Sequence, residues 1–427
     1  MRVLVVGSGA REHAIVHALR RSPEVSEVFA APGNPGIAQA ADLLPVPVDD
    51  VPALAEAAAD LRIDLTVVGP ELPLALGIGD EFSKRGLCLF GPTSAAAQLE
   101  SSKVFAKDFC HRHKIATPQA ISVVNEEQAR KAVKQFGFPV VLKADGLAAG
   151  KGVLIPGNHE ELDEALEAFF GRRSFGEAGT KVLVEEFLVG TEVSFMAISD
   201  GVKAIPLPTS RDYKRIGEGD TGPNTGGMGA HSPAMGLPRG FGRTIMDTVI
   251  TPVIQGMAAE GREYRGVLYA GLMLTEDGPK VLEFNCRFGD PETQAVLLRL
   301  EGSFAALVKS AADGQLALGS LSWRREVVAC VVAAAHGYPG SPRKGDDITG
   351  IEEAMALPAV TVYHAGTRLE DDRLVTSGGR VLSVCGRGPD LGTALETAYS
   401  GLGAIRFDGK IFRRDIGIDV SARGERA

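Results

Sequence analysis

The chain has 427 residues, which is too long for a single hydrophobic core, so about three domains are expected. Its net charge of −9 argues against a nucleic-acid partner, because neutralising many phosphates requires a basic face. The five scattered cysteines form no C-x-x-C pair, and no apolar run reaches the length of a membrane span. These features argue against a disulfide framework, a structural zinc site and membrane insertion, and favour the reducing cytoplasm.

Residues 1–100 are expected to form the first domain, a doubly wound α/β unit. Short apolar runs of the buried-strand type alternate here with helical segments, which is typical of a parallel sheet covered by helices. The expected strands are residues 2–6, 25–31, 65–68 and 88–90, and the expected helices are residues 12–21 and 52–59.

Glycine-containing loops follow the first three of these strands. The first loop, Gly7 to Glu12, begins like a dinucleotide fingerprint, but Glu12 replaces the third glycine and the second strand ends without an acidic residue for a ribose. Its backbone N–H groups could still bind an anion at the helix N-terminus. Asn34 and Glu71 lie in the next two loops, at the sheet edge where ligands bind. Ordinary turn chemistry is the alternative for any one loop, but three loops on one edge favour a site.

A strand that ends in a lysine precedes a glycine-rich loop. Lys143 ends the strand PVVLK, and the loop over residues 145–152 leads into a short strand, residues 153–155. This loop is not a Walker A motif, because the spacing before Gly150-Lys151 is short by one and Gly152 replaces Ser or Thr. A glycine loop between antiparallel strands predicts a flap over a triphosphate, with Lys143 reaching a phosphate. Helices are expected at residues 101–113, which contain Lys103 near the start, and at residues 126–136 and 163–170.

The apolar strand of residues 181–187 ends in a short linker that leads to Glu192. The linker backbone could bind the edge of an adenine, and Glu192 could accept a hydrogen bond from a ribose hydroxyl. The alternative is that Glu185, Glu186 and Glu192 are solvated carboxylates at a strand end. Further strands are expected at residues 192–198, 204–207 and 267–274, and a helix at residues 241–260.

Residues 220–230, DTGPNTGGMGA, form the most glycine-rich loop of the chain. The loop has no apolar period, so we expect neither a helix nor a core strand there. A loop of this kind is either a mobile linker or a lid. Because it lies between two sheet segments of one expected domain, the lid is favoured.

The stretch Val281 to Glu292, VLEFNCRFGDPE, gathers the most chemistry. Side chains alternate along its strand, so Glu283 and Asn285 share one face while Phe284 enters the core. A carboxylate and an amide oxygen on one face suit Mg²⁺ or Mn²⁺ that phosphates also hold, and Arg287 suits a transferring phosphoryl group. The acidic turn that follows could receive an ammonium group. The alternative is a strand end followed by a solvated, charged turn.

The composition shifts near residue 326 to a small β-rich terminal domain, after a linker near residues 314–322. Arg413 and Arg414 could bind a substrate phosphate or merely cover the surface. We expect strands at residues 326–335, 360–364, 379–385 and 410–412 and a helix at residues 391–402. The expected domains are therefore residues 1–100, 101–325 (with a flap subdomain at about 118–190) and 326–427.

Together these motifs resemble the ATP-grasp superfamily and, more narrowly, the phosphoribosylamine–glycine ligase family. The motifs that carry the resemblance are GxGxRE, PGNxG, GPExPL, KADGLAAGKGV, DTGPNTGGMGA and EFNCRFGDPE. The resemblance implies that ATP, glycine and 5-phosphoribosylamine react through a glycyl phosphate to give glycinamide ribonucleotide, ADP and phosphate, in purine biosynthesis. It implies ATP and Mg²⁺ or Mn²⁺ as cofactors, small-molecule substrates and no obligatory protein partner.

The resemblance also implies roles for individual residues. The metal would be held by Glu283 and Asn285, and the catalytic residues would be Arg287, Lys214 and Asp212. The nucleotide would contact Lys103, Lys143, Gly150, Lys151, Gly152, Glu185, Glu186, Phe187, Leu188 and Glu192. The substrates would contact Gly9, Arg11, Glu12, Asn34, Glu71, Asn224, Thr225, Gly226, Gly289, Asp290, Pro291 and Glu292. Many ATP-grasp enzymes carry a second acidic metal ligand on the preceding strand, which here has no carboxylate.

Three alternatives compete with this interpretation. Another carboxylate–amine or carboxylation ligase on the same fold would share the ATP site but differ in the acceptor. Gly7 and Gly9 suggest an NAD-dependent oxidoreductase, but the missing third glycine argues against it. The third alternative is a non-catalytic nucleotide-binding regulator. The residues that argue against a loss of activity are Lys143, Glu283, Asn285 and Arg287.

Overall fold

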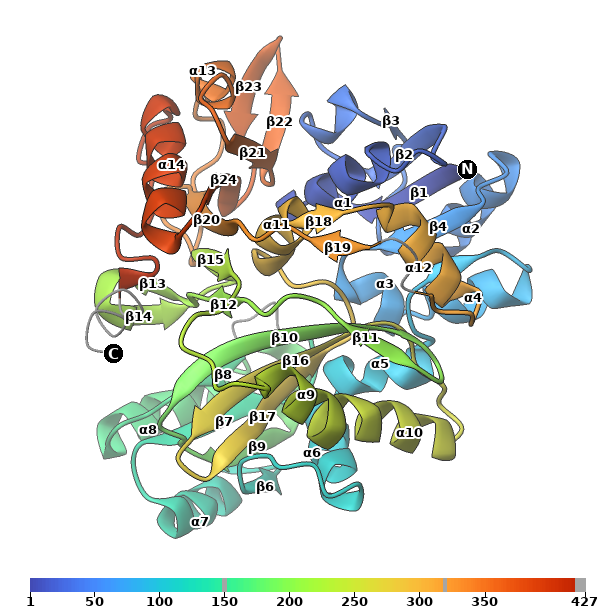
Figure 1. Cartoon of the computed structure of the whole chain (residues 1–427). Helices are drawn as coiled ribbons and strands as arrows, with labels where there is room; N and C mark the ends of the chain where they lie inside the picture. Colours follow the sequence, from blue (N-terminus) through green and yellow to red (C-terminus); the bar gives the residue numbers. More distant parts are fainter. Residues whose placement is uncertain (148–151, 318–320, 419–427) are drawn as a thin grey trace.

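The computed structural model describes residues 1–147, 152–317 and 321–418. Figure 1 shows the N-terminal elements (blue) beside the C-terminal elements (orange and red), with the central elements below both. The expected multidomain α/β and α+β architecture is confirmed. Within the described ranges, no helix combines the length and apolarity needed to cross a bilayer.

The N-terminal sheet is parallel and buried on both faces. Along β1, Leu4 and Val6 enter one core while Val3 and Val5 enter another, which explains the uninterrupted apolar run. The strand order is β3-β2-β1-β4-β5. The strands are β1 (Arg2–Gly7), β2 (Glu27–Pro32), β3 (Asp42–Leu43), β4 (Leu65–Val68) and β5 (Leu89–Phe90), and the helices are α1 (Ala10–Arg20), α2 (Val51–Asp60), α3 (Glu71–Ala75) and α4 (Ile78–Lys84).

The helix expected at residues 101–113 is preceded by a second one. Ser102 has an extended backbone and its hydroxyl accepts from the Phe105 N–H, so it ends α5 (Ser94–Ser101) and caps α6 (Lys103–Arg112). The carboxylate of Asp145, in the flap loop, accepts from the Ser102 hydroxyl at 3.0 Å and from the Val104 N–H at 3.1 Å. This break therefore joins α6 to the flap and places Lys103 on the first turn of the helix.

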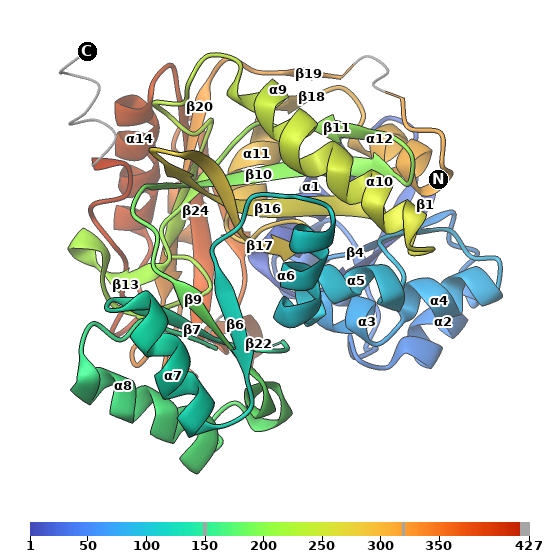
Figure 2. The same cartoon turned by 90° about the horizontal axis from the view of Figure 1, so that it is seen from below.

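Two antiparallel sheets face each other in the central region (Figures 1 and 2). The flap sheet has the order β6-β9-β7-β8 and the larger sheet the order β11-β10-β16-β17. The flap sheet consists of β6 (Ala120–Val123), β7 (Val140–Ala144), β8 (Val153–Leu154) and β9 (Val182–Glu186), with α7 (Glu126–Phe136) and α8 (His159–Leu166). The larger sheet consists of β10 (Thr191–Asp200), β11 (Ala204–Pro206), β16 (Arg265–Thr275) and β17 (Gly278–Asn285), with α9 (Phe241–Ile245) and α10 (Thr251–Ala259).

The third large sheet corrects the expectation for residues 220–230. Gly229 and Ala230 are buried and begin β15 (Gly229–Ser232), which pairs with β12 (Arg211–Asp212) and β20 (Val327–Ala334). A Cβ at Gly229 would lie 2.7 Å from the carbonyl oxygen of Cys330, so glycine permits this close approach. The order β12-β15-β20-β24-β21 joins strands from both sides of residue 326.

The C-terminal region supplies the last two strands of this sheet, β24 and β21, and the elements beside it. The strand expected at residues 410–412 is reduced to a single β-bridge between Ile411 and Ala334. The hairpin formed by β22 and β23 was not predicted from the sequence. The elements are β21 (Val360–His364), β22 (Thr367–Glu370), β23 (Arg373–Thr376), β24 (Arg380–Gly388), α13 (Ile351–Met355) and α14 (Leu391–Ala404). Between the central and C-terminal regions lie α11 (Glu292–Leu298), β18 (Leu300–Glu301), α12 (Phe304–Ala312) and β19 (Ser322–Trp323), and β13 (Arg215–Gly217) and β14 (Thr221–Asn224) form a separate hairpin.

Candidate active site

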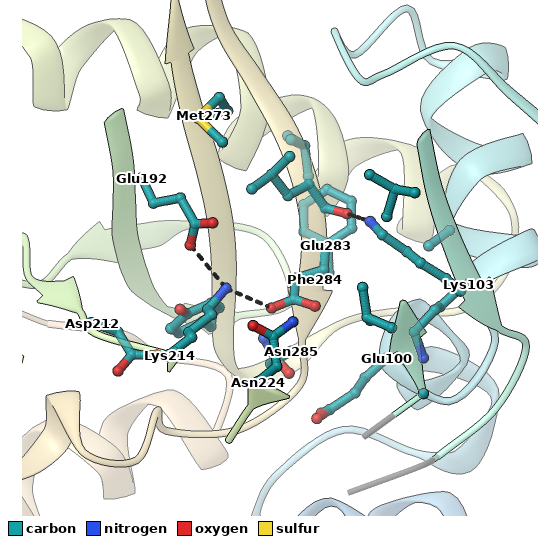
Figure 3. Close-up of a pocket in the computed structure, with 18 of the residues that line it drawn as sticks. Glu100, Lys103, Glu192, Asp212, Lys214, Asn224, Met273, Glu283, Phe284 and Asn285 are labelled. Carbon is teal, nitrogen blue, oxygen red and sulfur yellow. Dashed lines mark hydrogen bonds and ion pairs between the residues drawn. The ribbon is translucent and has the colours of Figure 1, made fainter. Parts of the chain in front are cut away.

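A cavity of about 790 Å³ lies between the flap sheet, the larger central sheet and the hairpin β13–β14. It brings together residues that are far apart in the sequence (Figure 3). The predicted site residues that line it are Arg11, Glu71, Lys103, Lys143, Gly152, Glu185, Glu186, Phe187, Leu188, Glu192, Asp212, Lys214, Asn224, Thr225, Gly226, Glu283, Asn285, Arg287, Asp290 and Glu292. Gly150 and Lys151 lie outside the described residues.

Glu283 and Asn285 lie on the cavity face of β17, as the alternation of the strand predicts, and Phe284 between them is buried. Lys214 reaches this face from the opposite wall: its Nζ lies 3.4 Å from Glu283 Oε1 and 3.1 Å from Glu192 Oε2 (Figure 3). Lys214 is the main reason that the pKa of Glu283 falls to about 2, and Lys143 and Lys103 act in the same direction. Glu283 is therefore ionised and available to a cation.

This pair fits a cation that phosphates also hold. Among the described residues, no group of three or more His, Cys, Asp or Glu side chains could form a metal site. An ion here would therefore take one carboxylate and one amide oxygen from β17 and the rest of its ligands from phosphates and water. Mg²⁺ commonly binds in this way, with one or two protein ligands beside substrate phosphates.

Three lysines line the neighbouring wall. Lys143 Nζ lies 2.7 Å from Glu185 Oε2 and donates to the Leu282 carbonyl at 2.8 Å, while Lys103 Nζ donates to the Gly146 carbonyl at 2.9 Å. Lys107 was missed: it lies one helical turn after Lys103, and its Nζ is 2.9 Å from Glu185 Oε1. The i, i+4 spacing of two lysines on α6 was the available signal.

The environment of Glu185 contradicts the interpretation of this residue as a solvated carboxylate. Its side chain is 2% exposed and lies between two lysines, so it is not a solvated carboxylate. Glu186 is half-buried and accepts from the Gln119 N–H at 2.9 Å, and Glu192 is paired with Lys214. Beyond them the cavity wall is apolar, with Val141, Leu188 and Met273. This part of the cavity suits a flat, uncharged ring.

Arg287 is held by two carboxylates from the N-terminal part of the chain. Its Nη2 lies 3.2 Å from Glu100 Oε1 and its Nε 3.4 Å from Glu71 Oε2. Glu100, which the sequence did not single out, has a side chain that is 9% exposed and accepts from the Cys286 N–H at 2.7 Å. Burial raises the pKa of Glu100, although Arg287 opposes the rise, whereas at Glu71 the effect of burial is outweighed by Arg287 and Arg11 and the pKa is lowered.

The acidic turn after β17 carries two carboxylates, Asp290 and Glu292, which have different hydrogen-bond partners. Asp290 Oδ2 accepts from Arg380 Nη2 at 2.8 Å and its Oδ1 from Gln294 at 2.7 Å, so both oxygens are engaged. Arg380, on β24, is a cavity residue that the sequence did not reveal. Glu292 accepts from the Ser194 and Tyr269 hydroxyls at 3.0 and 2.9 Å.

Asp212 faces Glu292 across a corner of the cavity. Its Oδ1 is buried without a hydrogen-bond partner, and burial together with the charge of Glu292 raises its pKa well above the usual value. Gly289 and Pro291 do not line the cavity but shape this corner. A Cβ at Gly289 would lie 2.5 Å from Glu292 Oε2, and Pro291 packs against Gly227.

Gly9, Glu12 and Asn34 do not line the cavity either. The Glu12 carboxylate accepts from the Gly9 N–H and from Arg11 Nε, the latter at 2.6 Å, and occupies the N-terminus of α1. A Cβ at Gly69 would lie 1.9 Å from Glu12 Oε1, so the glycine makes room for a protein carboxylate. In this structure the carboxylate of Glu12 takes the position at the helix N-terminus where we expected an anion.

Asn34 has all its polar atoms engaged with the protein backbone. Its Nδ2 donates to the carbonyls of Ser8 and His364 at 2.8 and 2.9 Å, and its Oδ1 accepts from the Gly36 and Ile37 N–H groups. In this structure Asn34 joins the N-terminal and C-terminal parts of the molecule, and its contact with a substrate stays a prediction.

Comparisons with known proteins agree with this geometry. The sequence matches the phosphoribosylglycinamide synthetase family over its N domain (residues 1–100), its ATP-grasp domain (residues 101–293) and its C domain (residues 328–419). The chain belongs to the phosphoribosylglycinamide synthetase family. It is 47% identical over 426 residues to the phosphoribosylamine–glycine ligase of Pseudomonas aeruginosa, covering 99% of each chain. It is also 47% identical over 428 residues to that of Mesorhizobium japonicum, covering 100% of each.

Solved structures extend the likeness to the fold. The structure of the phosphoribosylamine–glycine ligase of Thermotoga maritima has a TM-score of 0.84 and 36% identity, and the match covers 97% of this chain and 100% of that one. The biotin carboxylase domain of the 2-oxoglutarate carboxylase of Hydrogenobacter thermophilus has a TM-score of 0.73 at 16% identity, covering 98% and 92%. The second likeness concerns the fold alone.

Proposed function

We propose that this chain joins glycine to 5-phosphoribosylamine at the expense of ATP, to give glycinamide ribonucleotide, ADP and phosphate in purine biosynthesis. The observation that carries the proposal is the single cavity in which Lys103, Lys143, Glu283, Asn285 and Arg287 converge. A carboxylate is a poor electrophile, so ATP first converts glycine to glycyl phosphate. The amine then attacks the acyl carbon, the C–N bond forms, phosphate leaves and the nitrogen loses a proton. Such phosphoryl transfer depends mainly on positioning and charge neutralisation.

The nucleotide would occupy the side of the cavity next to the flap. Lys103 and Lys143 would neutralise its phosphates, and Glu283 with Asn285 would hold Mg²⁺ or Mn²⁺ beside them. When bound, the cation would spread the phosphate charge. The backbone after β9, at Phe187 and Leu188, would bind the adenine edge. Arg287, oriented by Glu71 and Glu100, would stabilise the phosphoryl group in transfer.

Asp212 and Glu292 are the better candidates for the ammonium group of glycine. We expected Asp290 or Glu292 in this role, but Asp290 already accepts from Arg380 and Gln294. Asp212 has a buried oxygen without a partner, and a second carboxylate lies nearby, which is an unfavourable arrangement unless a cation enters. The ammonium of glycine would supply that cation. The narrow corner beside Gly227 and Pro291 suits an amino acid without a side chain.

Phosphoribosylamine would enter from the N-terminal side, where Arg11 and Glu71 line the cavity. Asn224, Thr225 and Gly226 would close the opposite wall, and Lys214 would face the reacting groups. We also propose that the chain acts on small molecules in the cytoplasm and needs no nucleic-acid, membrane or protein partner.

The test is phosphate release from ATP, with phosphoribosylamine generated in situ and a panel of amino acids. We expect release to require glycine, phosphoribosylamine and a divalent cation together. Glu283→Gln should abolish metal-dependent turnover, whereas Glu276→Gln, in the exposed turn after β16, should not. Consumption of ATP with another acid or amine would replace the substrate assignment by that of a related ligase. Binding of ATP without any turnover would favour a nucleotide-binding regulator.

A further inference from the structure

Arg413 is among the most deeply buried large side chains of the protein, although it follows the last helix near the end of the described chain. Its guanidinium makes a bidentate pair with Asp415, at 2.7 and 2.6 Å, and lies over the ring of Tyr213 at 5.4 Å. The remaining nitrogen, Nη1, donates to Asp220 Oδ1 at 2.7 Å and to the Arg215 carbonyl at 3.2 Å. Arg413 therefore does not cover the surface, and it does not line the cavity where a substrate phosphate would bind.

Asp220 lies at the tip of the hairpin β13–β14, which Figure 1 places beside the C-terminal elements. Its backbone has a φ of +54°, in the left-handed region that Asp and Asn adopt more readily than other residues with a side chain. Asp415 adds a second bond at the tip, because its Oδ2 accepts from the Gly219 N–H at 2.8 Å. Arg413 and Asp415, which follow α14, therefore both bind the tip of the hairpin.

The base of the same hairpin carries residues of the active site. Thr225 closes it, since its N–H and its hydroxyl both donate to the Lys214 carbonyl, at 2.8 and 2.7 Å. The C-terminal region holds this end as well: Arg380 donates to the Gly226 carbonyl, and the Tyr338 hydroxyl accepts from the Gly226 N–H at 3.0 Å. Both ends of this cavity wall are thus held by residues that follow β19 in the sequence.

We propose that Arg413 is a positioning residue which, through Asp220, fixes the hairpin β13–β14 as a wall of the active site. This inference rests on the proposed function. With the hairpin fixed, Lys214 keeps its place between Glu192 and Glu283, and water stays away from glycyl phosphate. If the tip is released, water attacks the acyl carbon, the bond to the phosphate oxygen breaks, and glycine and phosphate form. ATP is then hydrolysed to ADP and phosphate without product.

The structure allows the charged bond between Arg413 and the tip to be weakened without exposing the core. Asp220 has a side chain that is 50% exposed, and Asp220→Asn leaves the pair between Arg413 and Asp415 intact. Asparagine also tolerates the left-handed backbone. We expect Asp220→Asn to raise the ratio of phosphate released to product formed from about one to three or more, and to lower kcat for product several-fold. Arg413→Met should do the same, with Arg413→Lys in between.

The matched control is Asp408→Asn, which removes an exposed arginine–aspartate pair of 2.6 Å in the same region, between Arg343 and Asp408. It should keep one phosphate per product. Circular dichroism and the melting temperature identify any variant that fails to fold, and Asp220→Asn decides the question if Arg413→Met does so. A wild-type enzyme that forms product, together with an Asp220→Asn variant that keeps the wild-type ratio and kcat, would overturn the inference. A wild type that forms no product contradicts the proposed function instead.

Discussion

At the scale of single residues, Glu100 is the clearest test of how Arg287 is oriented. Glu100 pairs with Arg287 at 3.2 Å and also accepts from the Cys286 N–H. We expect Glu100→Gln to lower kcat by about 10- to 100-fold, because hydrogen bonds to charged groups contribute about 1.5–3 kcal/mol. The KM for ATP should change little, since Lys103 and Lys143 remain. Steady-state kinetics with Glu260→Gln as the control, a carboxylate paired with Arg112 at the surface, would measure this. An unchanged kcat contradicts the orienting role.

The sequence predicted those site residues whose geometry is local. The alternation of β17 is sufficient to place Glu283 and Asn285 on one face, and this part of the prediction is confirmed by their position in the cavity. The partner of Asp290 could not be predicted, because Arg380 lies 90 residues further along the chain and only the fold brings the two together. The same holds for Asn34, whose bond to His364 spans 330 residues.

At the scale of elements, the buried carboxylate of Glu185 joins α6, β7 and β9 through Lys107 and Lys143. Glu185→Gln would leave two lysines in a buried site without a compensating charge. We expect the free energy of unfolding to fall by about 3 kcal/mol, because removing one partner of a buried ion pair is strongly destabilising. Urea titration would measure the change. Glu186→Gln, at a half-buried position one residue later, should change stability by less than about 1 kcal/mol. Equal effects of the two substitutions would contradict the argument.

Elements with an apolar period were predictable, and those formed by distant backbone pairing were not. The helix Glu126–Phe136 and the strands Leu65–Val68 and Val360–His364 agree with the predicted bounds. The strand β15 was missed because its sequence, GAHS, has no alternation and owes its burial to β20, about 100 residues away. Gly229 permits a close approach of two backbones, but the sequence alone does not distinguish such a glycine from one in a loop.

At the scale of the whole molecule, the C-terminal region contributes to the candidate active site. It supplies Arg380 and Tyr338 at the base of the hairpin and Arg413 at its tip, and it contacts the N-terminal domain through His364. The expected domain boundaries, which give residues 1–100, 101–325 and 326–427, stay a prediction. The sheet β12-β15-β20-β24-β21 crosses the last of these boundaries.

The contact between the N-terminal and C-terminal parts contains three histidines, of which His364 is buried and His13 and His17 are partly buried. The His364 N–H donates to His13 Nδ1 at 2.9 Å, so this nitrogen carries no proton, and His17 Nδ1 lies 3.0 Å from the Tyr363 hydroxyl. Burial is the main cause that lowers the pKa of His13 to about 3 and those of His17 and His364 to about 4, with Arg21 also acting on His17. All three are neutral in the folded protein at neutral pH.

Acid should therefore destabilise this contact before it affects the carboxylates. As the pH falls below about 6.5, the unfolded chain binds protons at these histidines and the folded chain does not, so stability present at neutral pH is lost down to about pH 4 for His17 and His364 and about pH 3 for His13. Each such histidine contributes up to about 1.4 kcal/mol per pH unit to the slope. His13→Asn, which keeps an acceptor near Nδ1, should flatten the pH dependence of unfolding by that amount, whatever its constant cost. His111→Gln, at an exposed position, should leave the slope unchanged, and equal slopes for wild type and His13→Asn contradict the prediction.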